Sequence, residues 1–426
     1  MNVNLAYGQG QLPVELPAER TTVIEPSPVA ALPDERAAVV AALESPTNAA
    51  PLREQAKPTD RVCIIFTDIT RATPNHRLIP WLLQQLAHVR RENITLLNST
   101  GTHRPNTKAE LEQMLTPEVV AGYRVVNHDA EDRAACAQVG TTRDGTPAMI
   151  NQLALEADLR ILTGFIEPHL FAGFSGGPKA LLPGVAWLGT VMSNHGARHI
   201  SDPNATWGVT DGNPLWEEMR DVALRCGRNF LLNVALNHER RITGVFAGDM
   251  LAAHKVGIEF VRRSAMQPVD APFDLVVTTN SGYPLDLNLY QGVKGMSAAA
   301  RIVKPGGTII LAAECREGVP DGSPCDRFLR AAAGPEEVLA AISSSGSPTA
   351  EQWQAQTQAL IQRKAKVLVH SSLSDETLRA VHLTPCHDIS AEVARRLAVS
   401  GSKARVAVLP QGPLTIPYLR RQTSRP

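Results

Sequence analysis

The stretch DLRILTGFIEPHLFAGFSGGPKALLPGVAWLGTVMSNHGARH, residues 158–199, decides how this chain is organised. Its apolar run Leu159–Phe165 is typical of a buried strand, and the run ends in Glu167-Pro168-His169. A glycine-rich loop at 173–177 then leads to Lys179, and a second glycine turn precedes His195. Two imidazoles, an amine and a loop with accessible backbone therefore follow one strand closely. Packing alone does not explain this combination, which predicts a functional site.

Two earlier segments have the same design of an apolar strand followed by polar residues. The run 61–67 precedes Asp68-Ile-Thr-Arg71, and the run 94–97 precedes a polar segment that contains His103. Helical patterns at 74–91 and 108–115 follow these segments. Strands that alternate with helices predict a parallel sheet covered on both faces, and such sheets bind ligands at the carboxyl ends of their strands. We therefore expect the polar segments after the strands to meet at one edge.

The second half of the chain carries another α/β set. Further strands are predicted at 274–279, 308–312, 365–370 and 404–409. The segment 265–272 has two prolines and no periodicity, which indicates a linker. The sequence thus predicts an α/β protein with two domains, each built on a mostly parallel sheet, and an active site in the cleft between them. Their expected bounds are 1–266 and 273–410, with a tail at 411–426 that packs back on the first domain.

Composition excludes several classes of protein. The chain has 426 residues, with 42 Lys and Arg against 42 Asp and Glu, so neither a nucleic acid nor a membrane is an expected partner. Six cysteines are scattered without a CxxC pair, which indicates neither a zinc knuckle nor a disulfide framework. The N-terminus lacks the pattern of a signal peptide, and no long apolar run occurs. We expect a cytoplasmic protein.

The residues alone leave several chemical readings open. His103 and His169 suit a general acid/base pair, and Arg71 and Lys294 suit an anion. The loop before Lys179 is only partly like a P-loop, because Pro178 precedes the lysine and no Ser or Thr follows it. A phosphate held by the backbone amides of 175–177 remains an alternative to a plain turn.

His195 also has more than one interpretation. It lies at helical spacing from Leu188 and Val191, as a core histidine would. It also lies four residues before His199, a spacing that can chelate a metal, although Gly196 weakens a helix between them.

Five motifs together resemble those of the nickel-pincer-dependent lactate racemases and their 2-hydroxyacid racemase and epimerase relatives. They are DITRATP at 68–74, GTHR at 101–104, GFIEPHLFAGFSGGPK at 164–179, NH at 194–195 and YQGVK at 290–294. The likeness spans most of the chain and keeps the order of the family. Pro178 departs from the family pattern, which affects the expected rigidity of the loop.

The resemblance implies a nickel-pincer nucleotide, a pyridinium-3-thioamide-5-thiocarboxylic acid mononucleotide that holds nickel, attached covalently to Lys179. It implies that His195 is the nickel ligand and that His103 and His169 are the catalytic acid/base pair. The other implied cofactor contacts are Asp68, Thr70, Arg71, Ser175, Gly176 and Gly177. The implied substrate contacts are Arg71, Tyr290, Gln291 and Lys294. The implied partners are a small 2-hydroxyacid and the proteins that make the cofactor and insert its nickel.

The reaction implied by the resemblance is inversion of the C2 centre by reversible hydride transfer to the cofactor. One histidine takes the hydroxyl proton as hydride leaves, and the planar keto acid can receive hydride on either face. Two other classes remain open. One is a divalent-metal-dependent hydrolase or lyase that uses His195, His199 and Glu167. The other is a non-catalytic protein that binds an organic anion or phosphate.

Overall fold

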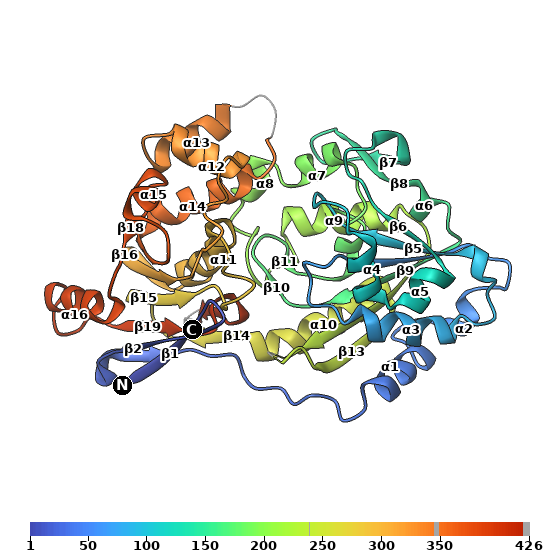
Figure 1. Ribbon diagram of the computed structural model, residues 1–426, viewed down its shortest axis with the longest axis horizontal. Coiled ribbons are helices and arrows are strands. Elements are labelled where there is room, and N and C mark those ends of the chain that lie inside the picture. Colours follow the sequence, from blue (N-terminus) through green and yellow to red (C-terminus); the bar gives the residue numbers. More distant parts are fainter. Residues whose placement is uncertain (238, 345–348, 421–426) are drawn as a thin grey trace, which may run out of the picture. The chain divides into compact units, whose positions relative to one another are not determined.

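The chain folds into two compact units in a computed structural model that describes residues 1–237, 239–344 and 349–420 (Figure 1). The first unit comprises Pro28–His195 and Asp202–Arg263. The second comprises Met1–Ser27, Gly196–Ser201 and the chain from Ser264 onward. Each unit is built on one six-stranded sheet, which confirms the predicted α/β class.

The sheet of the first unit has the order β13-β12-β9-β4-β5-β6. These strands are β4 (Val62–Thr67), β5 (Ile94–Ser99), β6 (Arg124–Asn127), β9 (Leu159–Phe165), β12 (Asn229–Leu236) and β13 (Ile242–Asp249). All neighbours are parallel except β12 and β13, which form an antiparallel hairpin at the edge. The central strand β9 is buried at every residue and β4 at every residue but Thr67, because helices cover both faces of the sheet.

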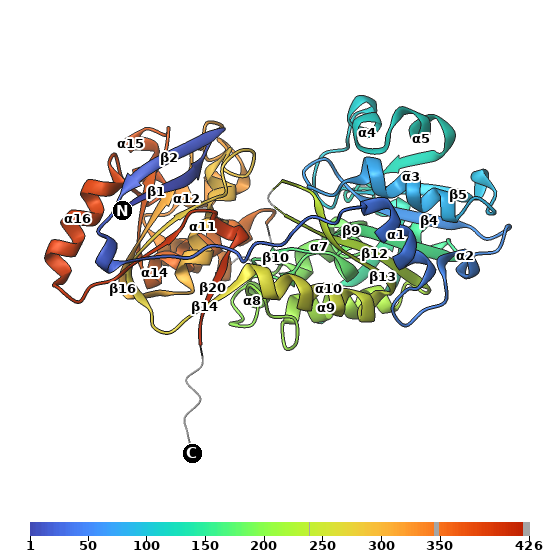
Figure 2. The same ribbon diagram turned by 90° about the horizontal axis from the view of Figure 1, so that it is seen from below.

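One part of the core of the first unit lies between its sheet and the helices on one face. Ile64 and Phe66 of β4 pack there with Leu78 and Leu82, and all four side chains are fully buried. Burial of each such side chain stabilises the fold by roughly 1.5–3 kcal/mol. Figure 2 shows α3 (Asn75–Gln85) and α9 (Pro214–Leu224) on opposite sides of this sheet.

Shorter elements complete the first unit. The helices are α1 (Glu35–Glu44), α2 (Leu52–Gln55), α4 (Lys108–Leu115), α5 (Pro117–Gly122), α6 (Gln152–Leu155), α7 (Leu188–Asn194) and α10 (Met250–Ala265), the last of which runs into the second unit. Two small hairpins join β7 (Cys136–Thr141) to β8 (Pro147–Asn151), and β10 (Pro168–His169) to β11 (Gly173–Phe174). Helix α3 ends at Gln85, well before the predicted end at residue 91, because Leu86 to Asn93 form turns instead.

The sheet of the second unit has the order β18-β17-β16-β15-β19-β3, with all neighbours parallel. Its strands are β3 (Thr21–Val23), β15 (Phe273–Thr279), β16 (Val303–Ala312), β17 (Lys366–His370), β18 (Thr384–Pro385) and β19 (Val406–Leu409). Its helices are α8 (Ala197–Ile200), α11 (Leu289–Ala300), α12 (Pro324–Ala331), α13 (Pro335–Ser344), α14 (Gln352–Lys364), α15 (Asp375–Ala380) and α16 (Ile389–Ser400). Figure 1 shows α11 and α14 on one side of this sheet, and the N-terminal hairpin on the other.

The predicted first domain of 1–266 is wrong at its beginning. The hairpin of β1 (Asn2–Tyr7) and β2 (Gly10–Glu15) buries Leu5 and Val14 in the core of the second unit. Strand β3 then extends the second sheet by pairing with β19. The N-terminal residues belong there because the apolar face of the hairpin packs on that sheet and the backbone groups of β3 pair with β19.

The predicted linker at 265–272 and the predicted tail also need correction. The linker contains a strand, β14 (Met266–Val269), which pairs with β20 (Ile416–Leu419) in the second unit. Residues 416–419 of the predicted tail therefore belong to the second unit, and residues 421–426 of that prediction lie outside the described part of the chain. Pairing satisfies the backbone hydrogen bonds of both extended segments.

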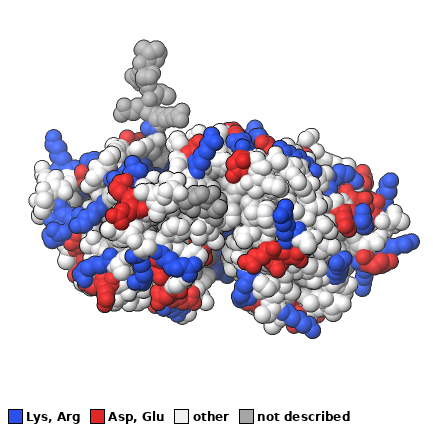
Figure 3. Space-filling view, turned by 90° about the horizontal axis from the view of Figure 1, so that it is seen from above, with Lys and Arg blue, Asp and Glu red and all other residues white. Residues whose placement is uncertain are grey.

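The surface carries charges of both signs. Figure 3 shows basic and acidic side chains interspersed over the face in view, as the balanced composition suggests. Among the described residues, the structure has no helix with the length and apolar character needed to cross a membrane.

Candidate functional site

Three polar segments follow three neighbouring strands of the first unit. Ile65 of β4 lies beside Leu97 of β5 and beside Leu162 of β9, so these strands end at the same edge of the sheet. Asp68 follows β4 and His103 follows the end of β5. His169 follows β9. The prediction that these strand ends are neighbours is confirmed.

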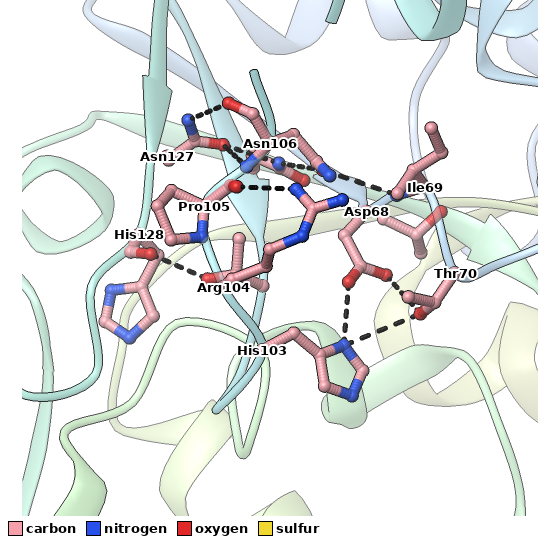
Figure 4. A network of polar contacts seen from close by, with 12 residues as sticks. Asp68, Ile69, Thr70, His103, Arg104, Pro105, Asn106, Asn127 and His128 are labelled. Atoms are coloured by element: carbon pink, nitrogen blue, oxygen red, sulfur yellow. Dashed lines mark hydrogen bonds and ion pairs between the residues drawn. The ribbon is translucent and has the colours of Figure 1, made fainter. Parts of the chain in front are cut away.

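His103 and Asp68 form a close pair at this edge (Figure 4). Nδ1 of His103 lies 2.7 Å from Oδ2 of Asp68, and Thr70 donates its hydroxyl to the other carboxylate oxygen at 2.8 Å. Burial of Asp68, which is 2% exposed, acts to raise its pKa, but bonds from His103 and Thr70 and the charge of Arg71 lower that pKa overall. Asp68 is therefore an anion, to which Nδ1–H of His103 donates. In the neutral ring of His103, the lone pair then lies on Nε2.

Three buried or half-buried asparagines hold the loops around this pair. Asn98 donates to the side-chain oxygens of both Asn106 and Asn127, each at 2.8 Å. Asn106 in turn accepts the backbone N–H of Ile69 at 3.3 Å, next to Asp68. The asparagines thus tie together the segments that follow β4, β5 and β6. This network was not predicted from the sequence, although the polar residue that ends each of β5 and β6 was a signal for it.

Arg71 lies beside a cavity next to Asp68. The cavity has a volume of about 210 Å³, and its lining includes Asp68, Arg71, His76, Arg77 and Arg240. Basic groups on several sides make this a suitable place for an anion. The structure therefore places Arg71 where a carboxylate or phosphate can reach it.

His169 is held by a short hairpin and by backbone amides. It pairs with Gly173 across β10 and β11. Its Nδ1 accepts the backbone N–H groups of Phe171 and Ala172, each at 3.2 Å. Its Nε2 lies 3.4 Å from Nζ of Lys179. The structure thus brings together the imidazole and the amine that the sequence of this segment suggests as functional groups.

The glycine-rich loop is held in place by a hydrogen bond to Asn233 of β12. Gly177 donates its backbone N–H to Oδ1 of Asn233 at 2.9 Å, and a Cβ on Gly176 would lie 2.4 Å from the same oxygen. Ser175 donates its backbone N–H to the carbonyl of Glu167 at 2.9 Å. The amides of Ser175 and Gly177 therefore already donate within the protein, which does not favour the interpretation that these two amides hold a phosphate. The loop instead forms a close-packed turn that begins the 3-10 helix Gly177–Ala180, which carries Lys179.

His254 of α10 supports the same loop. Its ring is 1% exposed, its Nε2 lies 2.8 Å from the carbonyl oxygen of Ser175, and a Cβ on Gly177 would lie 2.6 Å from the ring. Trp216 stacks on the ring at 6.4 Å between centroids. Burial lowers the pKa of His254 to about 4, so the ring is neutral and donates Nε2–H to Ser175. In the sequence His254 has no distinguishing signal, because nothing local links it to a loop so far away in the chain.

His195 follows the end of α7 and is 8% exposed. Phe171 lies between the two histidine rings, at 6.3 Å from His195 and 6.2 Å from His169. Asn194 anchors the end of the helix by donating to Glu218 at 2.9 Å. His199 lies on α8, a separate helix that begins after Gly196, so the two histidines do not form a pair on one helix.

The remaining predicted residues lie on α11 in the second unit. The phenol oxygen of Tyr290 accepts the indole N–H of Trp353 at 3.1 Å, and Gln291 donates its backbone N–H to Asn288 at 3.1 Å in the N-terminal cap. Lys294 precedes Gly295, where a Cβ would lie 2.1 Å from the carbonyl oxygen of Thr279. The helix can therefore pack closely on β15 only with glycine at this position. Trp353 was missed, because it comes from α14.

Comparison with known proteins places the chain in a family. Residues 7–208 match the lactate racemase N-terminal domain, and residues 269–416 match the lactate racemase C-terminal domain. The chain is 35% identical over 419 residues to a lactate racemase of Thermoanaerobacterium thermosaccharolyticum, covering 96% of this chain and 98% of the relative. The chain belongs to the lactate racemase family. A lactate racemase of Lactiplantibacillus plantarum is 38% identical over 383 residues, covering 89% of this chain and 90% of the relative.

Solved structures agree with membership of the lactate racemase family. The lactate racemase apoprotein of Thermoanaerobacterium thermosaccharolyticum superposes with a TM-score of 0.91 at 33% identity, covering 99% of this chain and all of that one. A protein from Thermotoga maritima has the same fold, with a TM-score of 0.67 at 19% identity over 91% of this chain and 99% of that one.

Proposed function

We propose that this member of the lactate racemase family is an isomerase that inverts the C2 centre of a 2-hydroxycarboxylate, lactate or a related hydroxyacid. The observation that carries the proposal is the contact between Lys179 and His169. His169 follows β9, which lies beside β4, and Asp68 at the end of β4 pairs with His103. An amine for a covalent tether and two imidazoles for proton transfer are the groups that this reaction needs.

The residues of the first unit fit a nickel-pincer nucleotide. Lys179 offers an amine for covalent attachment, and His195 offers one imidazole to the nickel. Among the described residues, no three His, Cys, Asp or Glu side chains gather into a metal site, so we assign the other nickel ligands to the nucleotide itself. When bound, the cofactor would supply an acceptor for the hydride that leaves C2. Asp68, Thr70 and Arg71 line or border the adjacent cavity and are proposed cofactor contacts.

In this proposal the glycine loop provides a close-fitting surface for the cofactor and does not donate the N–H groups of Ser175 and Gly177 to it. Ser175, Gly176 and Gly177 are proposed to lie against the cofactor near its tether, because no side chain larger than serine occurs in this turn. Pro178 is buried and stiffens the start of the short helix that carries Lys179. We infer that the tether begins at a fixed point of the backbone.

The protein side chains supply proton transfer and orientation. His103 takes the substrate hydroxyl proton through Nε2, and the buried carboxylate of Asp68 stabilises the imidazolium that results. His169 serves the mirror-image substrate. Arg71 of the first unit and Lys294 of the second are proposed to bind the substrate carboxylate, and Tyr290 and Gln291 lie with Lys294 on α11. The remaining partners that we propose are the proteins that synthesise the cofactor and insert its nickel.

The alternative of a metal-dependent hydrolase is not favoured by the structure. In that alternative, His195 and His199 bind one metal ion from successive turns of one helix. In the structure His195 follows α7 and His199 lies on α8. A test of the proposed function is to produce the protein together with the cofactor pathway and to measure intact mass, nickel content and chiral turnover of a panel of 2-hydroxyacids. A covalent adduct on Lys179, stoichiometric nickel and racemisation are expected. A fully loaded protein that racemises none of the panel would contradict the proposal.

A further inference from the structure

The hydrogen bonds of His169 fix which of its ring nitrogens carries a proton. Nδ1 accepts two backbone N–H groups, from Phe171 and Ala172, each at 3.2 Å. A nitrogen that accepts such bonds has a lone pair and no hydrogen. The neutral ring therefore carries its proton on Nε2. The imidazolium would place an N–H group against two others, so this position disfavours it.

The proton on Nε2 determines the state of Lys179. Nζ of Lys179 lies 3.4 Å from Nε2 of His169. An ammonium group has three donors and no acceptor, so it cannot receive the Nε2–H group. The neutral amine has a lone pair that can. The contact is therefore complementary only when Lys179 is a neutral amine.

The backbone of Lys179 is held on both sides of this contact. Its N–H donates to the carbonyl of Gly176 at 3.2 Å, and its carbonyl accepts the N–H of Gly184 at 3.2 Å. Gly177 and Pro178, immediately before it, are buried. The short helix thus presents the amine, which belongs to a partly buried residue, to His169 from a fixed position.

We propose that His169 has a second role, in which it presets Lys179 as a neutral, acylation-ready amine before the cofactor is attached. This inference rests on the proposed function for the identity of the acylating group, a thiocarboxylic acid. In the attachment, a bond forms between Nζ and the thiocarboxyl carbon, and the bond from that carbon to oxygen breaks. The oxygen leaves as water with one proton from the amine and one from the acid, and nothing is oxidised or reduced.

Attachment reverses the hydrogen bonding of Lys179. The nitrogen of an amide or thioamide has an N–H donor and no available lone pair. It therefore cannot accept Nε2–H of His169 once it is acylated. His169 must then leave the contact or move its proton, which makes it available to the substrate only after the tether has formed. Loading of the cofactor thus activates the histidine.

The experiment is competitive acetylation of the full-length, cofactor-free protein by a trace of acetic anhydride near neutral pH. Mass spectrometry compares Lys179 with Lys255, an exposed lysine of the same unit. Lys179 should react about tenfold faster or more, because only the neutral amine is a nucleophile. His169→Phe, which keeps a ring but has no Nε2–H, should abolish the advantage. His169→Gln, which can restore a donor, should recover part of it.

Two controls make the result decisive. His88→Phe changes an exposed histidine of the same unit, outside the cavity beside Asp68, and should leave the ratio unchanged. Unfolding curves show whether each variant is folded, and His169→Gln provides the test if His169→Phe is not. Equal labelling of Lys179 and Lys255 in the wild-type protein would overturn the inference, as would an unchanged ratio in both His169 variants. Because labelling needs no cofactor, this outcome is separate from a failure of the proposed function, which would appear as a loaded protein without racemase activity.

Discussion

Nδ1 of His103 lies 2.7 Å from Oδ2 of Asp68, and this contact joins the ends of two adjacent parallel strands. The carboxylate is almost fully buried, whereas the imidazole is 43% exposed. The buried partner therefore sets the tautomer and orientation of a ring whose other nitrogen faces outward. His169 has the opposite arrangement, since its Nδ1 accepts hydrogen bonds. The two histidines are thus chemically distinct before any ligand binds.

Asp68→Asn should slow turnover in both directions by about a hundredfold to ten-thousandfold, because the amide cannot stabilise the imidazolium that forms on His103. The variant preserves the size of the side chain, so cofactor attachment at Lys179 should persist. Chiral turnover and intact mass of the same sample check both statements. Asp60→Asn, in an exposed turn before β4, serves as the matched control. Wild-type turnover in Asp68→Asn would remove Asp68 from the proposed mechanism.

Lys179→Ala should abolish covalent retention of the cofactor and of nickel, since no other amine lies at the end of the glycine loop. His103→Ala should retain both and lose turnover, because His103 acts only on the substrate. Intact mass, nickel content and chiral turnover distinguish the two variants. Full racemisation by Lys179→Ala would show that the tether is placed wrongly.

Asn233→Leu should destabilise the glycine loop, because Gly177 would lose the acceptor for its buried N–H. The free energy of unfolding should fall by about 1–3 kcal/mol. The yield of the Lys179 adduct should fall as well, since the tether would no longer begin at a fixed point. Asn229→Leu is the control at the other end of β12, where the side chain binds Arg160. It should lower stability without lowering the adduct yield, and equal adduct losses in both variants would mean that stability alone matters.

His254 should contribute to the loss of stability in acid. Its pKa of about 4 in the folded protein lies below the ordinary value of 6.5, so the unfolded chain binds the extra proton first as the pH falls. The contribution is absent above about pH 6.5, grows as the pH falls toward 4, and reaches about 2 kcal/mol near pH 5. His254→Gln keeps a donor for Ser175 and cannot titrate. Urea unfolding near pH 8 and near pH 5 should show a smaller loss in the variant, and identical losses would contradict the role of His254.

Arg71→Ala and Lys294→Ala should each weaken binding of the substrate carboxylate by about 1.5–3 kcal/mol, as expected for a lost charge-assisted hydrogen bond. The KM should rise about tenfold to a hundredfold, with a smaller effect on kcat. Arg61→Ala provides a control at the opposite end of β4, where Arg61 pairs with Glu156 at the surface. An unchanged KM in both variants would rule out this anion site.

The strand ends could be predicted from the sequence because their signal is local. Each apolar run is followed directly by its polar residues, so the sequence alone predicts Asp68, His103 and His169 at one edge of the sheet. The helix over 108–115 was also predicted at its true bounds, and in the structure a capping box formed by Thr107 and Glu110 begins it.

The supports of the glycine loop could not be predicted, because they are distant in the chain. Asn233 and His254 come from β12 and α10 and meet the loop only through the fold. The same limit explains the error at the N-terminus. The hairpin pattern of residues 1–15 is visible in the sequence, but the sheet against which its apolar face packs is specified by residues far later in the chain.

The pairing of β3 with β19 sets an order on the synthesis of this protein. Strand β3 precedes the first unit in the sequence and its partner at Val406–Leu409 follows it, so β3 is synthesised well before β19. The first unit, whose segments lie between them, can complete its sheet while the N-terminal hairpin still has no surface on which to bury Leu5 and Val14. The nascent chain must therefore carry an apolar ribbon until the strands of the second sheet have been synthesised. This ribbon needs protection from aggregation for as long as the first unit takes to be made.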